Sequence, residues 1–139
     1  MHIEKQELRR RTTPGTDILD LTDDVEAFVA GTGINDGWVT VFVPGSTAGV
    51  TTLEFESGAV NDLRQAIERI APQDIEYEHN LRWGDGNGHS HVRAALLGPS
   101  LTLPISDGRV EHGTWQQIVL CDFDNKSRDR RIRLQAMGA

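Results

Sequence analysis

The chain has 139 residues and a formal net charge of −7 at pH 7, with 37% apolar and 25% charged residues. This length and composition predict one domain, residues 1–139, with its own hydrophobic core. The acidic balance argues against a general nucleic-acid binder, although a small anionic substrate needs only local positive groups. The sequence has no apolar run long enough to span a membrane and no signal-peptide pattern at residues 1–8. We therefore expect a cytoplasmic protein with no membrane partner.

The first half of the chain predicts strands around one helix. Charges on both faces of residues 2–11 indicate an edge strand. A short strand or helix entry follows at residues 18–21, and a helix capped by Thr22 or Asp23 ends at Gly31–Gly33. Residues 38–43 are apolar on both faces, which predicts a central strand, and we expect it to pair with a second strand at residues 48–55. Glu54 would then lie among half-buried neighbours, which is unusual for a carboxylate.

The second half begins with the clearest helix, which Ser57 caps and Pro72 ends. A short strand at 75–78 and a short helix at 90–97 follow. Further strands are predicted at residues 101–105, 114–123 and 130–136, with Asp107-Gly108 as a hairpin turn. The total of about seven strands and three helices, without regular βα alternation, predicts an α+β fold with a mainly antiparallel, β-sandwich-like core.

The segment from residue 79 to 98 is the candidate site, because it concentrates metal-competent and acid/base side chains between closely spaced glycines. His89 and His91 are spaced as His-x-His, which on extended backbone directs both imidazoles to one side. On a helix they would diverge, so they converge only if His89 lies in the loop or at the cap. With His79 as a third ligand they could hold a divalent metal, for which zinc is favoured and magnesium is the alternative. The other interpretation is capping, packing or surface histidines.

Other polar residues suggest acid/base and anion-binding roles. Glu54 or Asp85 could supply an oxygen ligand, and Glu54 could act as a general base or be a solvated edge residue. Asp85 and Asn87 could equally be turn formers and helix caps.

The turn at residues 45–49, with Ser46 and Thr47, could hold an anion through successive backbone N–H groups or be a plain turn. Arg82 and Arg93 flank the histidine loop. They could bind a phosphate or make surface ion pairs.

Several short segments resemble, in order and spacing, those of the YjbQ-type proteins, a family often labelled secondary thiamine-phosphate synthase enzymes. They are Val43–Ala48, Glu54, Tyr77–His79, Asp85–Asn87, His91, Leu97–Leu101 and Gly113–Ile118. The resemblance extends from about residue 38 to residue 133. It implies an α+β fold, a homotrimer and a polar, histidine-containing cleft.

The resemblance further implies a transferase that joins a pyrimidine diphosphate to a thiazole phosphate, with a phosphate-bearing small molecule as substrate and a divalent metal ion in the cleft. Catalytic roles are expected for Glu54, His79 and Asp85. Substrate or anion binding is expected for Ser46, Thr47, Asn87, Arg82 and Arg93. Metal ligation is expected for His79, His89 and His91. The alternatives are a metal-dependent hydrolase with Glu54 as base, and a non-enzymatic trimer that binds an anionic ligand.

The chain departs from the family pattern at two positions. Many members have histidine where this chain has Gly45, and aspartate or proline where it has His89. We hypothesise that His89 replaces the missing imidazole in the same cleft.

Overall fold

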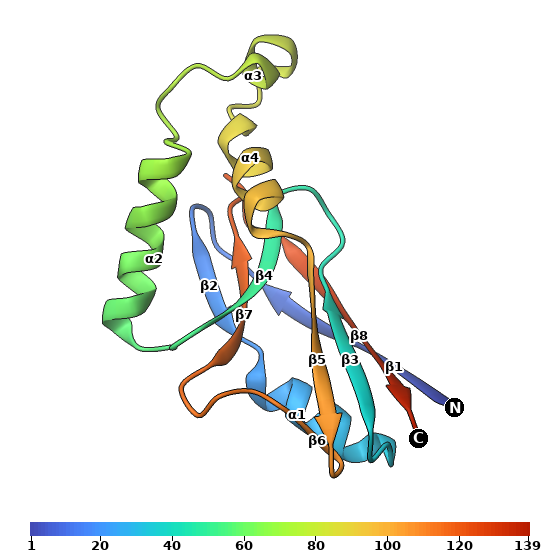
Figure 1. Ribbon diagram of the computed structural model, residues 1–139. Coiled ribbons are helices and arrows are strands. Elements are labelled where there is room, and N and C mark those ends of the chain that lie inside the picture. The colour runs from blue at the N-terminus through green and yellow to red at the C-terminus, as the bar shows by residue number, and fades with distance from the viewer.

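The computed structural model describes residues 1–139 and contains eight strands and four helices (Figure 1). The strands are β1 (His2–Arg11), β2 (Asp17–Asp20), β3 (Gly37–Phe42), β4 (Ala48–Leu53), β5 (Ser100–Ser106), β6 (Arg109–Val110), β7 (Gln117–Asp122) and β8 (Asp129–Gly138). The helices are α1 (Thr22–Thr32), α2 (Ser57–Ile70), α3 (Glu78–Trp83) and α4 (Gly88–Leu97). The predicted α+β class is confirmed, with one strand and one helix more than expected.

The strands form two antiparallel sheets. The larger sheet has the order β1-β8-β3-β5-β6 and the smaller one the order β2-β7-β4. Their facing sides enclose the main core, to which Val41 and Leu134 contribute from the larger sheet and Val50 and Leu120 from the smaller. Alternation along β8 buries every second residue from Arg130 to Ala136, as a strand with one face on a core requires.

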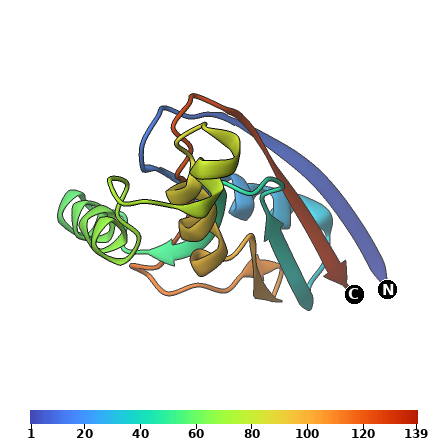
Figure 2. The ribbon, with the colours of Figure 1, turned by 90° about the horizontal axis from the view of Figure 1, so that it is seen from above.

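A second core lies on the other side of the smaller sheet. Val119, Cys121 and Phe123 pack there against Val60 of α2 and Ala94 of α4. Figure 2 shows α2 and α4 on this side of the molecule and β3, β8 and β1 on the other. Cys121 is a buried core residue, and burial raises the pKa of its thiol to about 12.

The expected pairing of the strands at 38–43 and 48–55 is wrong. β3 pairs with β5 and β8 in the larger sheet, whereas β4 pairs with β7 in the smaller one. The connection between β3 and β4 therefore crosses from one sheet to the other instead of closing a hairpin. β3 is central, but its outer face is uncovered, with Trp38 45% and Phe42 37% exposed. Glu54 lies just beyond β4 and is exposed, so it is not among half-buried neighbours.

The helices differ from prediction at their starts. α2 is capped by Glu56 instead of Ser57: its carboxylate accepts hydrogen bonds from the N–H groups of Gly58 (2.9 Å) and Ala59 (2.5 Å). These bonds hold the pKa of Glu56 below its ordinary value. No strand forms at residues 75–78, where the chain instead enters α3 at Glu78. None of the four helices has the length and hydropathy needed to cross a bilayer.

Candidate functional site

Two short helices and a glycine-containing turn position the histidines. Gly84 ends α3 with a φ of 65°, and Gly86 has a φ of 66°, so both occupy left-handed backbone that glycine tolerates best. At the start of α4 the N–H of Gly88 donates to the side-chain oxygen of Asn80 at 2.8 Å. A Cβ on Gly88 would lie 2.6 Å from the Cβ of Tyr77. The absence of a side chain at Gly88 is therefore what lets α4 start against the α3 region.

His79 of α3 and His91 of α4 form a ring pair, with centroids 4.4 Å apart and planes tilted by 52°. The Nδ1 atom of His91 lies 3.1 Å from the carbonyl oxygen of Ser46. Because a carbonyl oxygen only accepts, His91 Nδ1 carries the hydrogen, which leaves the Nε2 lone pair of the neutral ring available. The Nδ1 atom of His79 is buried and lies 3.4 Å from Asp85 Oδ1 without forming a hydrogen bond. The pair thus has nitrogen atoms that the protein does not satisfy.

His89 does not join this pair. α4 begins at Gly88, so His89 and His91 are two positions apart on a helix, where about 100° per residue separates their directions widely. The His89 ring is 2% exposed, lies 6.5 Å from the Tyr77 ring, and has Nε2 3.3 Å from Ser90 Oγ. Burial and the nearby Arg93 guanidinium lower the pKa of His89. The structure therefore does not support the hypothesis that His89 supplies a third imidazole to the cleft.

The residues of one chain do not fit the expected three-histidine metal centre. The buried, unpartnered Nδ1 of His79 and the free Nε2 of His91 are suitable donor atoms. However, no group of three or more His, Cys, Asp or Glu side chains is arranged to hold a metal ion. A zinc site needs at least three protein ligands, so a single chain supplies an incomplete set.

The two arginines expected at the site are used elsewhere. The guanidinium of Arg93 is buried and ion-pairs with Glu68, with Nε donating to the Ala71 carbonyl (3.0 Å) and Nη1 to Thr16 (3.2 Å). It ties α4 to the end of α2 instead of facing the histidine pair. Arg82 is exposed, and its guanidinium lies 5.5 Å from the ring centre of Trp83.

The predicted anion turn lies directly against His91. Ser46 is exposed and its carbonyl contacts His91, whereas Thr47 is buried. The backbone N–H groups of Gly45, Ser46 and Thr47 have no acceptor in the protein. A cavity of about 210 Å³ is lined by Gly45 and Ser46 of this turn and by His91, and its other walls are apolar, formed by Ala48, Ala94, Ala95 and Pro99. Three successive free donors beside an imidazole suit an anionic group.

Asn87 and Glu54 do not face this cavity. The side-chain oxygen of Asn87 accepts from Ser90 Oγ (2.5 Å) and from the N–H of Asn125 (3.3 Å), so Asn87 holds α4 to the loop after β7. Glu54 is exposed and makes no hydrogen bond or ion pair through its side chain. Its role as a base stays a prediction.

Beneath the turn lies a network of buried ion pairs that the sequence analysis did not predict. Arg130 donates through Nε and Nη2 to both oxygens of Asp122, at 2.6 and 2.9 Å, and through Nη2 to Thr47 Oγ1 at 2.6 Å. Thr47 donates in turn to Asp124 (2.9 Å), which also accepts from Arg128 (2.9 Å). Burial would raise the pKa of Asp124, but these hydrogen bonds hold it below its ordinary value. The only sequence feature that indicates this network is the pair Asp122 and Asp124, which follows the apolar residues of β7.

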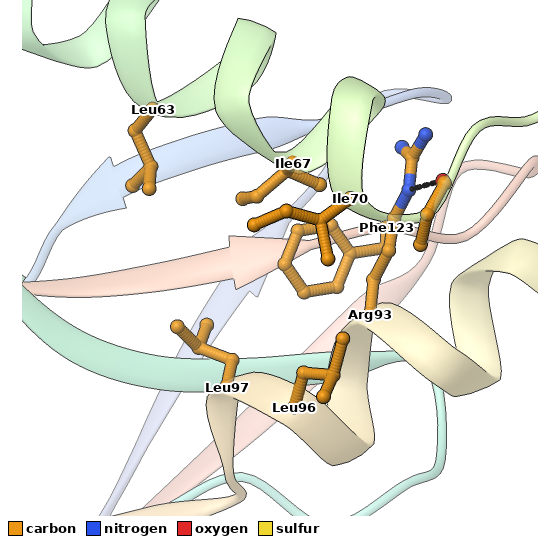
Figure 3. A pocket seen from close by; sticks show the side chains of 8 residues that line it. Leu63, Ile67, Ile70, Arg93, Leu96, Leu97 and Phe123 are labelled. Atoms are coloured by element: carbon orange, nitrogen blue, oxygen red, sulfur yellow. Dashed lines mark hydrogen bonds between the residues drawn. The ribbon is translucent and has the colours of Figure 1, made fainter.

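A second cavity, of about 190 Å³, lies between α2 and α4 (Figure 3). Seven apolar residues and Arg93 line it, and Phe123 closes its floor. In Figure 3 the Arg93 guanidinium points away from Leu96 and Leu97 toward the Ala71 carbonyl, so the cavity presents hydrocarbon and no free polar group. It is separate from the histidine pair.

Two antiparallel sheets with α2 and α4 packed on the outer side of the smaller one, and a histidine pair against the turn that links the sheets, define an α+β protein with a polar site beside α3 and α4. The chain belongs to the UPF0047 protein YjbQ-like family, whose sequence model matches residues 6–139.

The chain is similar along its length to other members of the family. It is 37% identical to a UPF0047 protein of Methanothermobacter thermautotrophicus over 138 residues, covering 99% of this chain and 94% of that one. It is 42% identical over 117 residues to a UPF0047 protein of Mycobacterium tuberculosis, covering 84% and 86% of the two chains.

Solved structures show the same fold. A hypothetical protein of Aeropyrum pernix K1 superposes with a TM-score of 0.90 at 30% identity, covering 98% of this chain and 99% of that one. A YbjQ-like protein of unknown function from Sulfolobus solfataricus P2 gives a TM-score of 0.89 at 30% identity, covering 99% and 100%.

Proposed function

We propose that the His79–His91 pair and the turn at residues 45–47 form the site of a phosphate-handling transferase of the secondary thiamine-phosphate synthase type. Such an enzyme joins a hydroxymethylpyrimidine diphosphate to a thiazole phosphate and releases pyrophosphate. The single observation that carries the proposal is the contact of the His91 ring, already paired with His79, with a turn that has three unused backbone N–H donors. An imidazole next to such donors suits a reaction that moves a proton while an anionic group departs.

Each part of the site has a chemical role in this proposal. The N–H groups of the turn bind phosphate oxygens, which neutralises developing negative charge without reorganisation. His91 exchanges a proton through Nε2, because its Nδ1 is committed to the Ser46 carbonyl. Asp85, 3.4 Å from His79 Nδ1, places a carboxylate beside the second ring of the pair.

The test is pyrophosphate release from the two named substrates by wild-type protein and by His79→Asn and His91→Asn. Loss of proton transfer by a positioned imidazole is expected to lower turnover by about 100-fold or more. His2→Asn is the matched control, because His2 is exposed on β1 and pairs with Glu4. Unchanged turnover in both site variants, with all three proteins folded by circular dichroism, would contradict the proposal.

The same purified proteins also distinguish the transferase from the two alternative functions, a hydrolase and a binding protein. Hydrolysis of simple esters or phosphoesters without an acceptor substrate would replace the transferase proposal with a hydrolase. Tight binding of an anion without turnover would replace it with a binding protein.

The divalent metal stays a prediction that elemental mass spectrometry tests on protein purified without chelator. One zinc per chain, lost in a His79→Asn/His91→Asn variant, would support a metal site completed by further ligands. No metal after reconstitution would assign the histidines to acid/base chemistry alone.

We also propose that the chain forms the homotrimer implied by its resemblance to the family. The uncovered outer face of the larger sheet supports self-association, because register places Ile3, Met137, Trp38 and Pro104 in one row across four strands. An apolar row on an open sheet face is typical of an interface. Sedimentation equilibrium should give three times the mass of 15.4 kDa, and Trp38→Lys should reduce it. A monomeric wild-type protein would contradict the proposal.

A further inference from the structure

We infer that Arg130 is the arginine that binds phosphate at this site, through its Nη1 group and the backbone N–H groups of residues 45–47. The inference deepens the proposed function and rests on it only in taking that phosphate group as part of the substrate. It replaces the two arginines favoured by sequence, Arg82 and Arg93, neither of which is directed at the turn in the structure.

The guanidinium of Arg130 is held in a fixed orientation. The residue is 8% exposed, and its Nε and Nη2 groups are occupied by Asp122 and Thr47. Nη1 alone donates to no atom of the protein, and it is not among the fully buried polar atoms without a partner. A guanidinium anchored on one side with a free amine on the other is pre-organised to bind an oxyanion.

Gly45 determines what Nη1 faces. A Cβ built on Gly45 would lie 2.9 Å from Nη1, so a side chain at this position would cover the free donor. Gly45 has a φ of 116°, a backbone conformation that side chains rarely adopt. The glycine thus brings Nη1 against the same turn whose N–H groups are free, and Gly45 and Ser46 of this turn line the cavity beside His91.

The acidic groups nearby do not oppose an incoming anion. Asp122 accepts from Arg130 on both oxygens, from Thr12 and from the N–H of Asp124. Asp124 accepts from Thr47, Arg128 and the N–H of Lys126, and both carboxylates are about 1% exposed. Two arginines balance two aspartates, and every carboxylate oxygen is directed into the network. The groups left without a partner at the turn are therefore all hydrogen-bond donors: Arg130 Nη1 and the backbone N–H groups of residues 45–47.

Isothermal titration with inorganic pyrophosphate tests the inference without requiring turnover. Arg130→Lys keeps a positive charge but has no Nη1, and it should weaken pyrophosphate binding by about 10-fold or more, the worth of a charge-assisted hydrogen bond. Arg128→Lys is the matched control, because Arg128 contacts Asp124 and not Asp122, and its side chain is 46% exposed. Arg82→Lys should also retain wild-type affinity. Wild-type affinity in Arg130→Lys would overturn the inference.

A second measurement uses the wild-type protein, since replacing a buried arginine can unfold the chain. Titration with pyrophosphate should shift the backbone amide resonances of Gly45, Ser46 and Thr47 and the guanidinium resonance of Arg130. Shifts confined to the surroundings of Arg82, or no binding, would overturn the inference.

The two proposals fail separately. Pyrophosphate bound at the turn of a protein whose histidine variants keep full turnover would refute only the proposed function. Histidine-dependent turnover with pyrophosphate bound elsewhere would refute only the role of Arg130.

Discussion

Arg130 and Asp122 form a buried, bidentate ion pair that connects the start of β8 to the end of β7, and so connects the two sheets. The nitrogen–oxygen distances are 2.6 and 2.9 Å, and the two side chains are 9% and 1% exposed. A pair this well aligned fixes the relative position of the sheets at the point where the turn at residues 45–47 passes between them.

Replacing Asp122 should therefore be costly. Asp122→Asn keeps the shape but leaves the buried Arg130 charge with only Asp124, 3.9 Å from Nη2, as a counter-ion. This loss of the bidentate partner is expected to lower the free energy of unfolding by about 3–5 kcal/mol. Asp129→Asn is the control, because it removes the ion pair between Asp129 and Arg11, in which the Asp129 side chain is 79% exposed. It should change the free energy of unfolding by less than about 1 kcal/mol. Urea denaturation of the three proteins measures both effects. Equal losses in the two variants would contradict a special role for the buried pair.

Gly88 offers a test of how α4 is seated. Gly88→Ala would place a Cβ 2.6 Å from the Cβ of Tyr77, and the resulting overpacking is expected to cost about 1–3 kcal/mol. Gly31→Ala in α1 is the matched control, because no atom lies within 4 Å of its added Cβ. That change should stabilise the protein by about 0.5–1 kcal/mol through helix propensity. Thermal unfolding monitored by circular dichroism should move the two midpoints in opposite directions; a shift in the same direction would contradict the geometry.

Much of the fold follows from local sequence patterns. The apolar stripe of α2 and the alternation of β8 were sufficient to predict those elements, because one buried face leaves a period in the sequence. Pairing was harder to predict. β3 and β4 are neighbours in sequence, and consecutive strands usually pair, but here Pro44–Thr47 leads the chain into the other sheet. No residue in that short connection marks the change of sheet.

The candidate site was predictable in part. The concentration of histidines distinguishes residues 79–91 from the rest of the sequence, and the structure places His79 beside His91. The direction of His89 could not be predicted, because it depends on whether α4 begins before or after it, and helix starts are the least certain feature of a sequence pattern. Arg130 was missed because it is distant in sequence from the turn and reaches it only through the pairing of β8 with its neighbours.

The buried imidazole of His89 should make stability depend on pH on the acid side. Burial lowers its pKa in the folded state, so the unfolded chain binds a proton first as the pH falls below its value of about 6.5. The contribution of neutral His89 is thus fully present above that value and is lost as the pH falls toward the folded pKa. His89→Gln should flatten this part of the profile, whereas His2→Gln on the surface should leave it unchanged. Urea denaturation between pH 5 and 8 measures the slopes, and identical slopes in all three proteins would contradict the assignment.

His112 should make stability depend on pH in the opposite direction to His89, through its contact with Glu26 of α1. The ring lies between two acceptors, with Nε2 2.5 Å from Glu26 and Nδ1 2.9 Å from the Gly113 carbonyl. Both nitrogens therefore carry hydrogens in this arrangement, and the hydrogen bond to Glu26 raises the pKa of His112.

This contribution to stability is complete below the unfolded value of about 6.5 and is lost as the pH rises through the raised folded pKa. Glu26→Gln removes the acceptor charge, so the stability difference between wild type and variant should be largest near pH 5 and should shrink on the alkaline side. Glu76→Gln, at an exposed carboxylate with no ion-pair partner in the structure, serves as the control and should give a difference independent of pH. A wild-type advantage that grows with pH would show that the His112–Glu26 contact does not carry an imidazolium.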